Sequence, residues 1–334
     1  MTTGHASASS AASRVQPRHL LMTSVCTSVL IVGAMVGALL SAGSDTNAAD
    51  RRPGGRTSDW TSQSDQSPEY VGDISPCTTP VNVQIQSANQ ESSGLVVTTT
   101  LLSTCASGDL IANDRFRLTA VDDAGRDVAA GVFDLSSTPI VVPGDDVSTT
   151  VTFTFPAGTY WRTPGATNGA LTFAAHREGA ASSPSAGTTG ASAVTAIDVG
   201  APEHGSLDAA AFSALVDIVA SDLQYIDSNL LEVWQPQLSS KRPGLYYEGV
   251  TWQANDIVRE HMQLRQRYPD AKLVWSGDWP VYRIKDWWIT VSGIPMSSGA
   301  AANDWCASEG WDADHCFAKM LSHRLGESGT TMNR

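Results

Sequence analysis

The residues of this sequence that could carry chemistry are tryptophans and acids near the C-terminus. Eight of the ten tryptophans lie between residues 234 and 311, together with the acids Glu248, Asp278 and Asp286. Because Trp joins a large apolar ring system to one N–H donor, this density predicts either a tight aromatic core or an aromatic binding surface. Paired carboxylates could cleave a glycosidic bond. Asp278 and Asp286 flank an expected turn, however, where acids are ordinary, so we favour binding over catalysis.

No other residue pattern points to an enzyme or to a cofactor. His261 and His315 have no neighbouring nucleophile or ligand set, and no GxSxG, HExxH, P-loop or GxGxxG motif occurs in a credible context. The formal net charge of −13 argues against nucleic acid, whose phosphates recruit basic patches. The sequence therefore predicts a non-enzymatic protein with no cofactor, metal site or nucleic-acid partner.

The five cysteines divide into one isolated residue and two close pairs. Cys26 lies alone, whereas Cys77 is near Cys105 and Cys306 is near Cys316. Paired spacing downstream of an export signal predicts two disulfides in an oxidising compartment. A zinc site built from Cys306, Cys316 and His315 is the alternative, but it lacks the usual CxxC spacing.

The N-terminal part predicts a membrane anchor. Residues 20–42 contain no charge over 23 positions, which is long enough for a helix to cross a bilayer. The basic flank in residues 1–19 predicts a cytoplasmic N-terminus, so the rest of the chain would be extracytoplasmic. A cleaved signal peptide is the alternative. Residues 43–76 are polar and aperiodic and predict a flexible stalk.

Two folded modules are expected after the stalk. Residues 77–178 contain short β-rich runs separated by turn residues, which predicts an immunoglobulin-like all-β sandwich. Residues 179–205 read as a linker, and Ser206 as the cap of a helix over 207–224. The second module, 206–325, is α+β, and 326–334 is a tail. Its expected strands are 229–239, 271–277, 287–293 and 316–322, with helices over 254–268 and 299–309.

The order strand, helix, strand, strand, helix, strand is that of the ferredoxin-like split motif. The phrases VWQPQLSS (233–240) and WWITVSGIPMSS (287–298) in that order resemble the SPOR-type module. WSGDW (275–279) and DWWITVSG (286–293) also resemble extracytoplasmic modules of uncharacterised actinobacterial membrane proteins. The SPOR resemblance implies an extracytoplasmic module of the cell envelope that binds the glycan strands of peptidoglycan.

Strand alternation selects the expected ligand contacts. In 287–293, Trp288 and Thr290 share one face, and we expect this face to be exposed and the other to cover the helices. A register error of one residue would reverse the two faces. The expected binding residues on or beside the strands are Trp234, Gln237, Trp275, Trp279, Trp288 and Thr290.

Two other functions remain open at this stage. The Trp-rich face could dock another envelope protein, as in an interaction or sensor ectodomain. A glycan hydrolase is the third hypothesis. A groove lined by Trp favours glycan binding, a flat apolar patch favours a protein partner, and two close carboxylates in a deep cleft favour hydrolysis.

Overall fold

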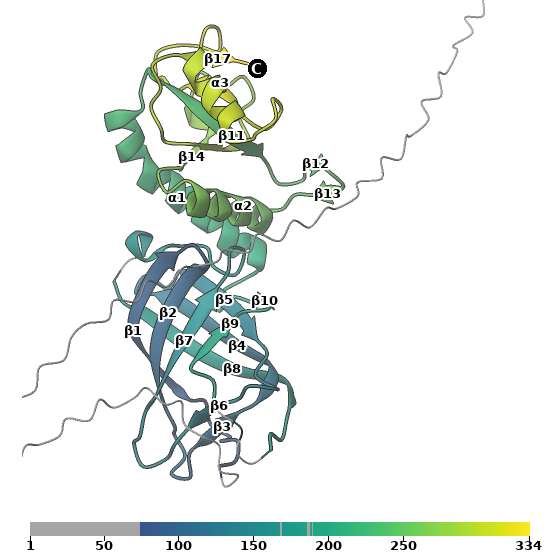
Figure 1. The fold of residues 1–334 in the computed structure, drawn as a ribbon. Helices are drawn as coiled ribbons and strands as arrows, with labels where there is room; N and C mark the ends of the chain where they lie inside the picture. The colour runs from purple at the N-terminus through teal and green to yellow at the C-terminus, as the bar shows by residue number, and fades with distance from the viewer. Residues whose placement is uncertain (1–73, 168, 186–187, 189) are drawn as a thin grey trace, which may run out of the picture. The chain divides into compact units, whose positions relative to one another are not determined.

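The computed structural model describes residues 74–167, 169–185, 188 and 190–334 (Figure 1). All of them belong to one compact unit, Gln63–Arg334. The expected cytoplasmic tail, membrane helix and Cys26, and nearly all of the stalk, lie outside the described residues. Within the described part the chain is mostly β-sheet with three α-helices.

The N-terminal half of the described chain forms two four-stranded sheets. One contains β1 (Asn82–Glu91), β2 (Gly94–Leu102), β7 (Thr149–Phe155) and β9 (Ala193–Thr195), in this order. The other runs β10 (Asp198–Val199), β5 (Asp127–Phe133), β4 (Asn113–Asp122), β8 (Leu171–Ala181). The short strands β3 (Asp109–Ile111) and β6 (Ile140–Val142) pair separately, and a 3₁₀ turn, η1, spans Pro164–Ala166. Neighbouring strands are antiparallel except for β7 and β9.

Alternating side chains of these strands form an aromatic core. Every second residue of β2 and of β7 is buried, as expected for strands with one face on a core. Phe153 lies 6.4 Å from Phe116 and 5.1 Å from Phe133, measured between ring centroids, and Phe133 meets Phe155 edge-on. Cys77 and Cys105 form the expected disulfide, which joins the segment before β1 to the segment after β2.

The helix α1 (Leu207–Asn229) begins at the expected cap and continues beyond the expected end at residue 224. The Ser206 hydroxyl accepts a hydrogen bond from the backbone N–H of Ala209 at 3.2 Å. By length and composition α1 is apolar enough to cross a membrane, a test that core helices also meet. Its buried residues Ala211 and Leu215 belong to a core shared with the two four-stranded sheets, whereas Ile226 packs in a second cluster with residues of the C-terminal sheet.

A buried cation joins α1 to the preceding sheets. The Arg162 side chain is 1% exposed and donates to the Asp217 carboxylate of α1 at 2.7 Å. Arg126 reaches the same carboxylate at 2.9 Å. Trp161 donates its indole N–H to Asn255 at 2.8 Å. The Asp217 side chain is 31% exposed, so only the guanidinium of Arg162 is fully buried in this contact. Without Asp217 the buried Arg162 charge would lose its ion-pair partner on α1.

The C-terminal elements build one antiparallel sheet with the order β14, β15, β11, β16, β17. Its strands are β11 (Trp234–Lys241), β14 (Lys272–Trp275), β15 (Trp288–Val291), β16 (Phe317–Met320) and β17 (Thr331–Met332). Helix α2 (Ala254–Arg267) connects β11 to β14, and α3 (Gly299–Ser308) connects β15 to β16. The first four strands and both connecting helices follow the expected order along the chain. The expected tail contains β17, which pairs with β16.

Local chemistry explains the ends of these helices. Gln253 and Asp256 form a reciprocal capping box at the start of α2, and the Ser298 hydroxyl accepts from Ala301 N–H at the start of α3. Cys306 and Cys316 form the second expected disulfide, which ties the end of α3 to the residue before β16.

The stretch between β11 and α2, expected to be irregular, contains a hairpin. Strands β12 (Tyr246–Tyr247) and β13 (Val250–Thr251) pair across Glu248 and Gly249. Both turn residues have positive φ, 51° and 81°, which is the conformation that a two-residue hairpin turn requires. A further 3₁₀ turn, η2 (Ser276–Asp278), follows β14.

Candidate functional site

The two faces of the C-terminal sheet differ from the expectation at β15. Trp288 is 6% exposed and meets the ring of Phe212 edge-on at 5.7 Å, and Thr290 is 3% exposed, with its hydroxyl 3.0 Å from His261 Nδ1. Phe212 belongs to α1 and His261 to α2. The expected exposure of Trp288 and Thr290 is therefore wrong: their face is the one that the helices cover.

The opposite face carries a groove with mixed apolar and polar walls, made of two adjoining pockets of about 250 and 290 Å³. We call it the sheet groove. Both pockets are lined by the same four central residues, Gln237, Ser240, Trp287 and Phe317. Because they share these four residues, the two pockets adjoin, and together they form an elongated depression.

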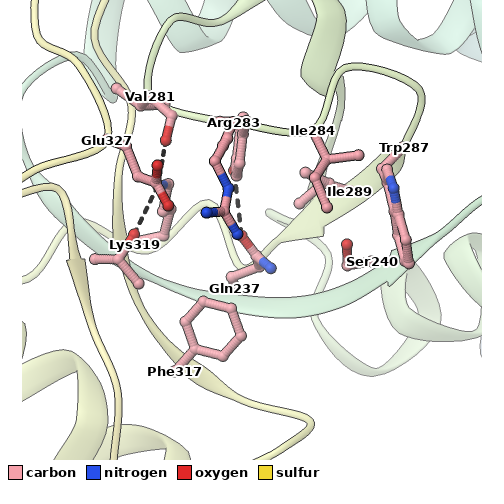
Figure 2. Close-up of a pocket in the computed structure, with 12 residues that line it drawn as sticks. Gln237, Ser240, Val281, Arg283, Ile284, Trp287, Ile289, Phe317, Lys319 and Glu327 are labelled. Atoms are coloured by element: carbon pink, nitrogen blue, oxygen red, sulfur yellow. Dashed lines mark hydrogen bonds between the residues drawn. The ribbon is translucent and has the colours of Figure 1, made fainter. Parts of the chain in front are cut away.

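Figure 2 shows the first pocket, with Trp287 at one end and Lys319 and Glu327 at the other. Arg283 and Gln237 lie between them, and Phe317 lies on the β16 side. The Tyr282 hydroxyl donates to Gln237 Oε1 at 3.2 Å, which fixes the Gln237 amide. The pocket thus alternates aromatic surface with hydrogen-bonding groups.

Lys319 holds the far end of this pocket together. It is 2% exposed and donates to the Val281 carbonyl at 2.8 Å and to Thr331 Oγ1 at 2.7 Å. Its ammonium lies 4.5 Å from the centroid of the Tyr282 ring, a cation–π distance. Burial lowers the pKa of Lys319 to about 8, partly opposed by the nearby charge of Glu327. Lys319 therefore clamps residue 281 and β17 against β16.

The second pocket ends at a Tyr–His–Asp chain. The Tyr247 hydroxyl is 3.0 Å from His315 Nε2, and His315 Nδ1 is 2.7 Å from Asp312. The hydrogen bond with His315 lowers the pKa of the Asp312 carboxyl. Burial and the neighbouring charge of Glu248 raise the pKa of Tyr247, so this phenol stays protonated and serves as a donor rather than as a nucleophile.

A separate cavity of about 470 Å³ lies on the helix-covered side. We call it the aromatic cleft. Trp275 and Trp288 are directly opposite each other on β14 and β15. Arg242 bridges to Asp286 at 2.8 Å. The cleft is lined by Phe212, Val216, Val219, Arg242, Pro243, Trp275, Asp278, Asp286 and Trp288.

The structure distributes the expected binding residues over three environments. Gln237 lines the sheet groove, whereas Trp275 and Trp288 line the aromatic cleft. The other three, Trp234, Trp279 and Thr290, line none of these cavities. Trp279 is 1% exposed and stacks on His323 at 4.4 Å. Trp234 is partly buried and opposite Met320 of β16.

Sequence reasoning missed most of the groove residues, among them Tyr247, Arg283, Phe317 and Lys319. One signal was available for Trp287. Because adjacent residues of a strand point to opposite faces, a Trp-Trp pair presents one indole to each side of the sheet. Arg283 comes from the loop between β14 and β15, for which alternation gives no direction.

The acids considered for hydrolysis do not form one site. Asp278 and Asp286 line the aromatic cleft, while Glu248 lies at the hairpin turn, 3.5 Å from His315. Asp286 forms an ion pair with Arg242 at 2.8 Å. Among the described residues, no group of three or more His, Cys, Asp or Glu side chains is placed to hold a metal ion.

Comparison with known proteins gives no match: no family model, no curated protein and no solved structure is similar to this chain.

Proposed function

We propose that this chain is a non-enzymatic envelope protein whose sheet groove binds a cell-wall glycan strand outside the cytoplasm. The proposal assigns the first module to the immunoglobulin-like sandwiches. It assigns the second to the ferredoxin-like folds, because strands β14, β15, β11 and β16 have the all-antiparallel order of a βαββαβ motif.

The observation that carries the proposal is the lining shared by the two pockets. Trp287 and Phe317 provide aromatic surface, and Gln237 and Ser240 provide donors and acceptors beside it. Aromatic rings pack against the C–H faces of sugar rings, and the amide and hydroxyl groups bond to the sugar hydroxyls. An elongated groove with both kinds of group side by side fits a polymer of sugars.

The two ends of the groove add hydrogen-bonding groups of different kinds. Glu327 lines one end, with Arg283 between it and Trp287 (Figure 2), and Asp314 and His315 line the second pocket. Planar charged side chains bond to hydroxyl and acetamido groups with defined geometry. This distribution supports recognition of an amino-sugar polymer in one orientation.

The remaining features support a place outside the cytoplasm. The disulfides Cys77–Cys105 and Cys306–Cys316 are compatible with an oxidising compartment. The proposal includes a single-pass anchor at residues 20–42, which would hold the binding module close to the wall.

Co-sedimentation with peptidoglycan sacculi tests the proposal. Oxidised protein comprising residues 63–334, the compact unit that holds both disulfides, is mixed with sacculi before and after an amidase removes the stem peptides. We expect binding to increase on the denuded glycan, because stem peptides obstruct access to the sugar rings. Equal absence of binding to both preparations would contradict the proposal and direct attention to a protein partner.

A further inference from the structure

The aromatic cleft is a second cavity with its own lining residues, although its Arg242 lies over the Trp287 ring of the sheet groove at 5.8 Å. Trp288 lines the cleft and Ile289 lines the groove, and consecutive residues of β15 point to opposite faces of the sheet. None of the residues that line the cleft also lines the pockets of the groove. A ligand in the cleft would therefore not compete for the same space as one in the groove.

The shape and lining of the cleft are those of a small-molecule site. Its volume of about 470 Å³ falls within the usual range for ligand pockets, roughly 300–1,000 Å³. Apolar walls come from α1 through Phe212, Val216 and Val219, and from the sheet through Trp288. Phe212 and Val216 remain about half exposed, at 50% and 48%. An apolar ligand body would cover this surface.

Trp275 forms an aromatic platform at the mouth of the cleft. Its six-membered ring lies directly on the backbone of Gly277, so closely that a Cβ at position 277 would overlap ring carbon Cζ3. The Trp275 residue is nevertheless 36% exposed. One face of the indole is thus supported by Gly277 while the side chain stays accessible, an arrangement that suits stacking of a cation or a flat group.

The charges at the mouth favour a cation. Asp278 is exposed, and its carboxylate forms no salt bridge or hydrogen bond with another side chain in the described part of the chain, while Asp286 is neutralised by Arg242 at 2.8 Å. These three charges sum to −1. A cationic head could lie between the Trp275 ring and Asp278, while its apolar tail enters the space between α1 and Trp288.

We propose that the aromatic cleft binds an organic cation with an apolar body, such as an alkylammonium compound. The ring of Trp275 and the carboxylate of Asp278 recognise the cationic head, and the α1 side chains Phe212, Val216 and Val219 cover the tail. This inference goes beyond glycan binding and does not depend on it.

Titration of residues 63–334 with decyltrimethylammonium, kept monomeric, tests the proposal by calorimetry and tryptophan fluorescence. We expect saturable binding that Asp278→Asn and Gly277→Ala each weaken at least threefold. The backbone of Gly277 is not in the left-handed region, so alanine causes no backbone strain there. The effect of Gly277→Ala on binding would therefore come from displacement of the Trp275 indole by the new Cβ. Asp304→Asn, at an exposed acid of α3, is the matched control and should leave the affinity unchanged.

Two further probes decide between ligand classes and sources. Decyl sulfate has the same tail with an anionic head, and we expect it to bind at least tenfold more weakly. Phosphatidylcholine vesicles present a cationic group within a lipid surface. The proposal is overturned by equal affinity for decyl sulfate, by an equal effect of Asp304→Asn, or by binding to vesicles without saturable binding of the monomeric cation. Circular dichroism of each variant confirms folding.

Discussion

The two faces of the C-terminal sheet use tryptophan in different ways. On the helix-covered face, Trp288 is 6% exposed and packed against Phe212, and Trp275 lies over Gly277 at the edge of an apolar cavity. On the opposite face, Trp287 is half-buried and lines both pockets of the sheet groove. Neighbouring residues of nearly identical sequence context therefore differ in what they contact.

This difference shows that tryptophan density alone does not define a binding surface. One indole of the Trp287–Trp288 pair contributes mainly to packing, and the other faces a cavity with hydrogen-bonding neighbours. Substitutions on the two faces should accordingly separate loss of stability from loss of binding.

The largest expected effect is on the helix-covered face. Trp288→Ala removes a buried indole from contact with α1 and should lower the free energy of unfolding by about 3–5 kcal/mol. A urea titration of residues 63–334 measures this change. A loss below about 1 kcal/mol would show that the indole is not packed as described.

The Cys306–Cys316 disulfide comes next, because it holds α3 on the same face. Replacing both cysteines by serine should lower the free energy of unfolding by about 2–3 kcal/mol, from the chain entropy that the short loop regains in the unfolded state. Urea titrations of the oxidised protein and the double variant measure the loss. No change in stability would indicate that the two thiols are not joined.

On the groove face, Lys319 makes the free energy of unfolding depend on pH. Its pKa is lowered by burial from 10.5 to about 8. Between about pH 8 and 10.5 the unfolded chain binds more protons at this position than the folded chain does, so stability from this residue rises with pH in that window. Lys319→Met should remove about 1–3 kcal/mol of this rise.

Urea titrations of wild type and Lys319→Met at pH 7.5 and pH 10 give the four free energies needed. For each protein, the free energy of unfolding at pH 7.5 is subtracted from that at pH 10. The difference between the two results gives the contribution of Lys319 separately from that of the other titrating groups. Identical pH dependence in both proteins would mean that the ammonium is not buried in the groove wall.

Trp287→Ala should have the smallest effect on stability. The side chain is half-buried, so its loss should change the free energy of unfolding by less than about 1.5 kcal/mol. Binding of glycan should nevertheless fall about tenfold or more, as for an anchoring aromatic residue. Thermal unfolding and co-sedimentation with denuded sacculi measure the two effects separately. A variant that binds as wild type does would remove Trp287 from the site.

The order of helices and strands was predictable from the sequence, but which face of the C-terminal sheet the helices cover was not. The Ser206 cap, apolar periodicity and cysteine spacing are local signals, and the corresponding helices and disulfides are present. The exposure of Trp288 depended on which face α1 and α2 cover. Which face is covered depends on packing between segments far apart in the sequence, including the contact of Phe212 with Trp288. Local sequence patterns do not predict such contacts.

The sheet groove was still less accessible to sequence reasoning. Its walls come from the loop that holds Arg283, from the hairpin that holds Tyr247, and from the segment before β17 that holds Glu327. The Glu248-Gly249 turn could have indicated the hairpin, since Gly at the second position is typical of such turns. The approach of the hairpin to His315 depends on the tertiary fold.

Titration of one variant on each face of the sheet tests whether the glycan binds in the sheet groove. Wild type, Trp287→Ala and Trp275→Ala, all comprising residues 63–334, are titrated with soluble peptidoglycan glycan fragments in the calorimeter. We expect Trp287→Ala to lose most of the affinity for the glycan fragments and Trp275→Ala to retain it. Loss of affinity in Trp275→Ala with binding retained in Trp287→Ala would place the glycan in the aromatic cleft, and glycan binding in the sheet groove would be wrong.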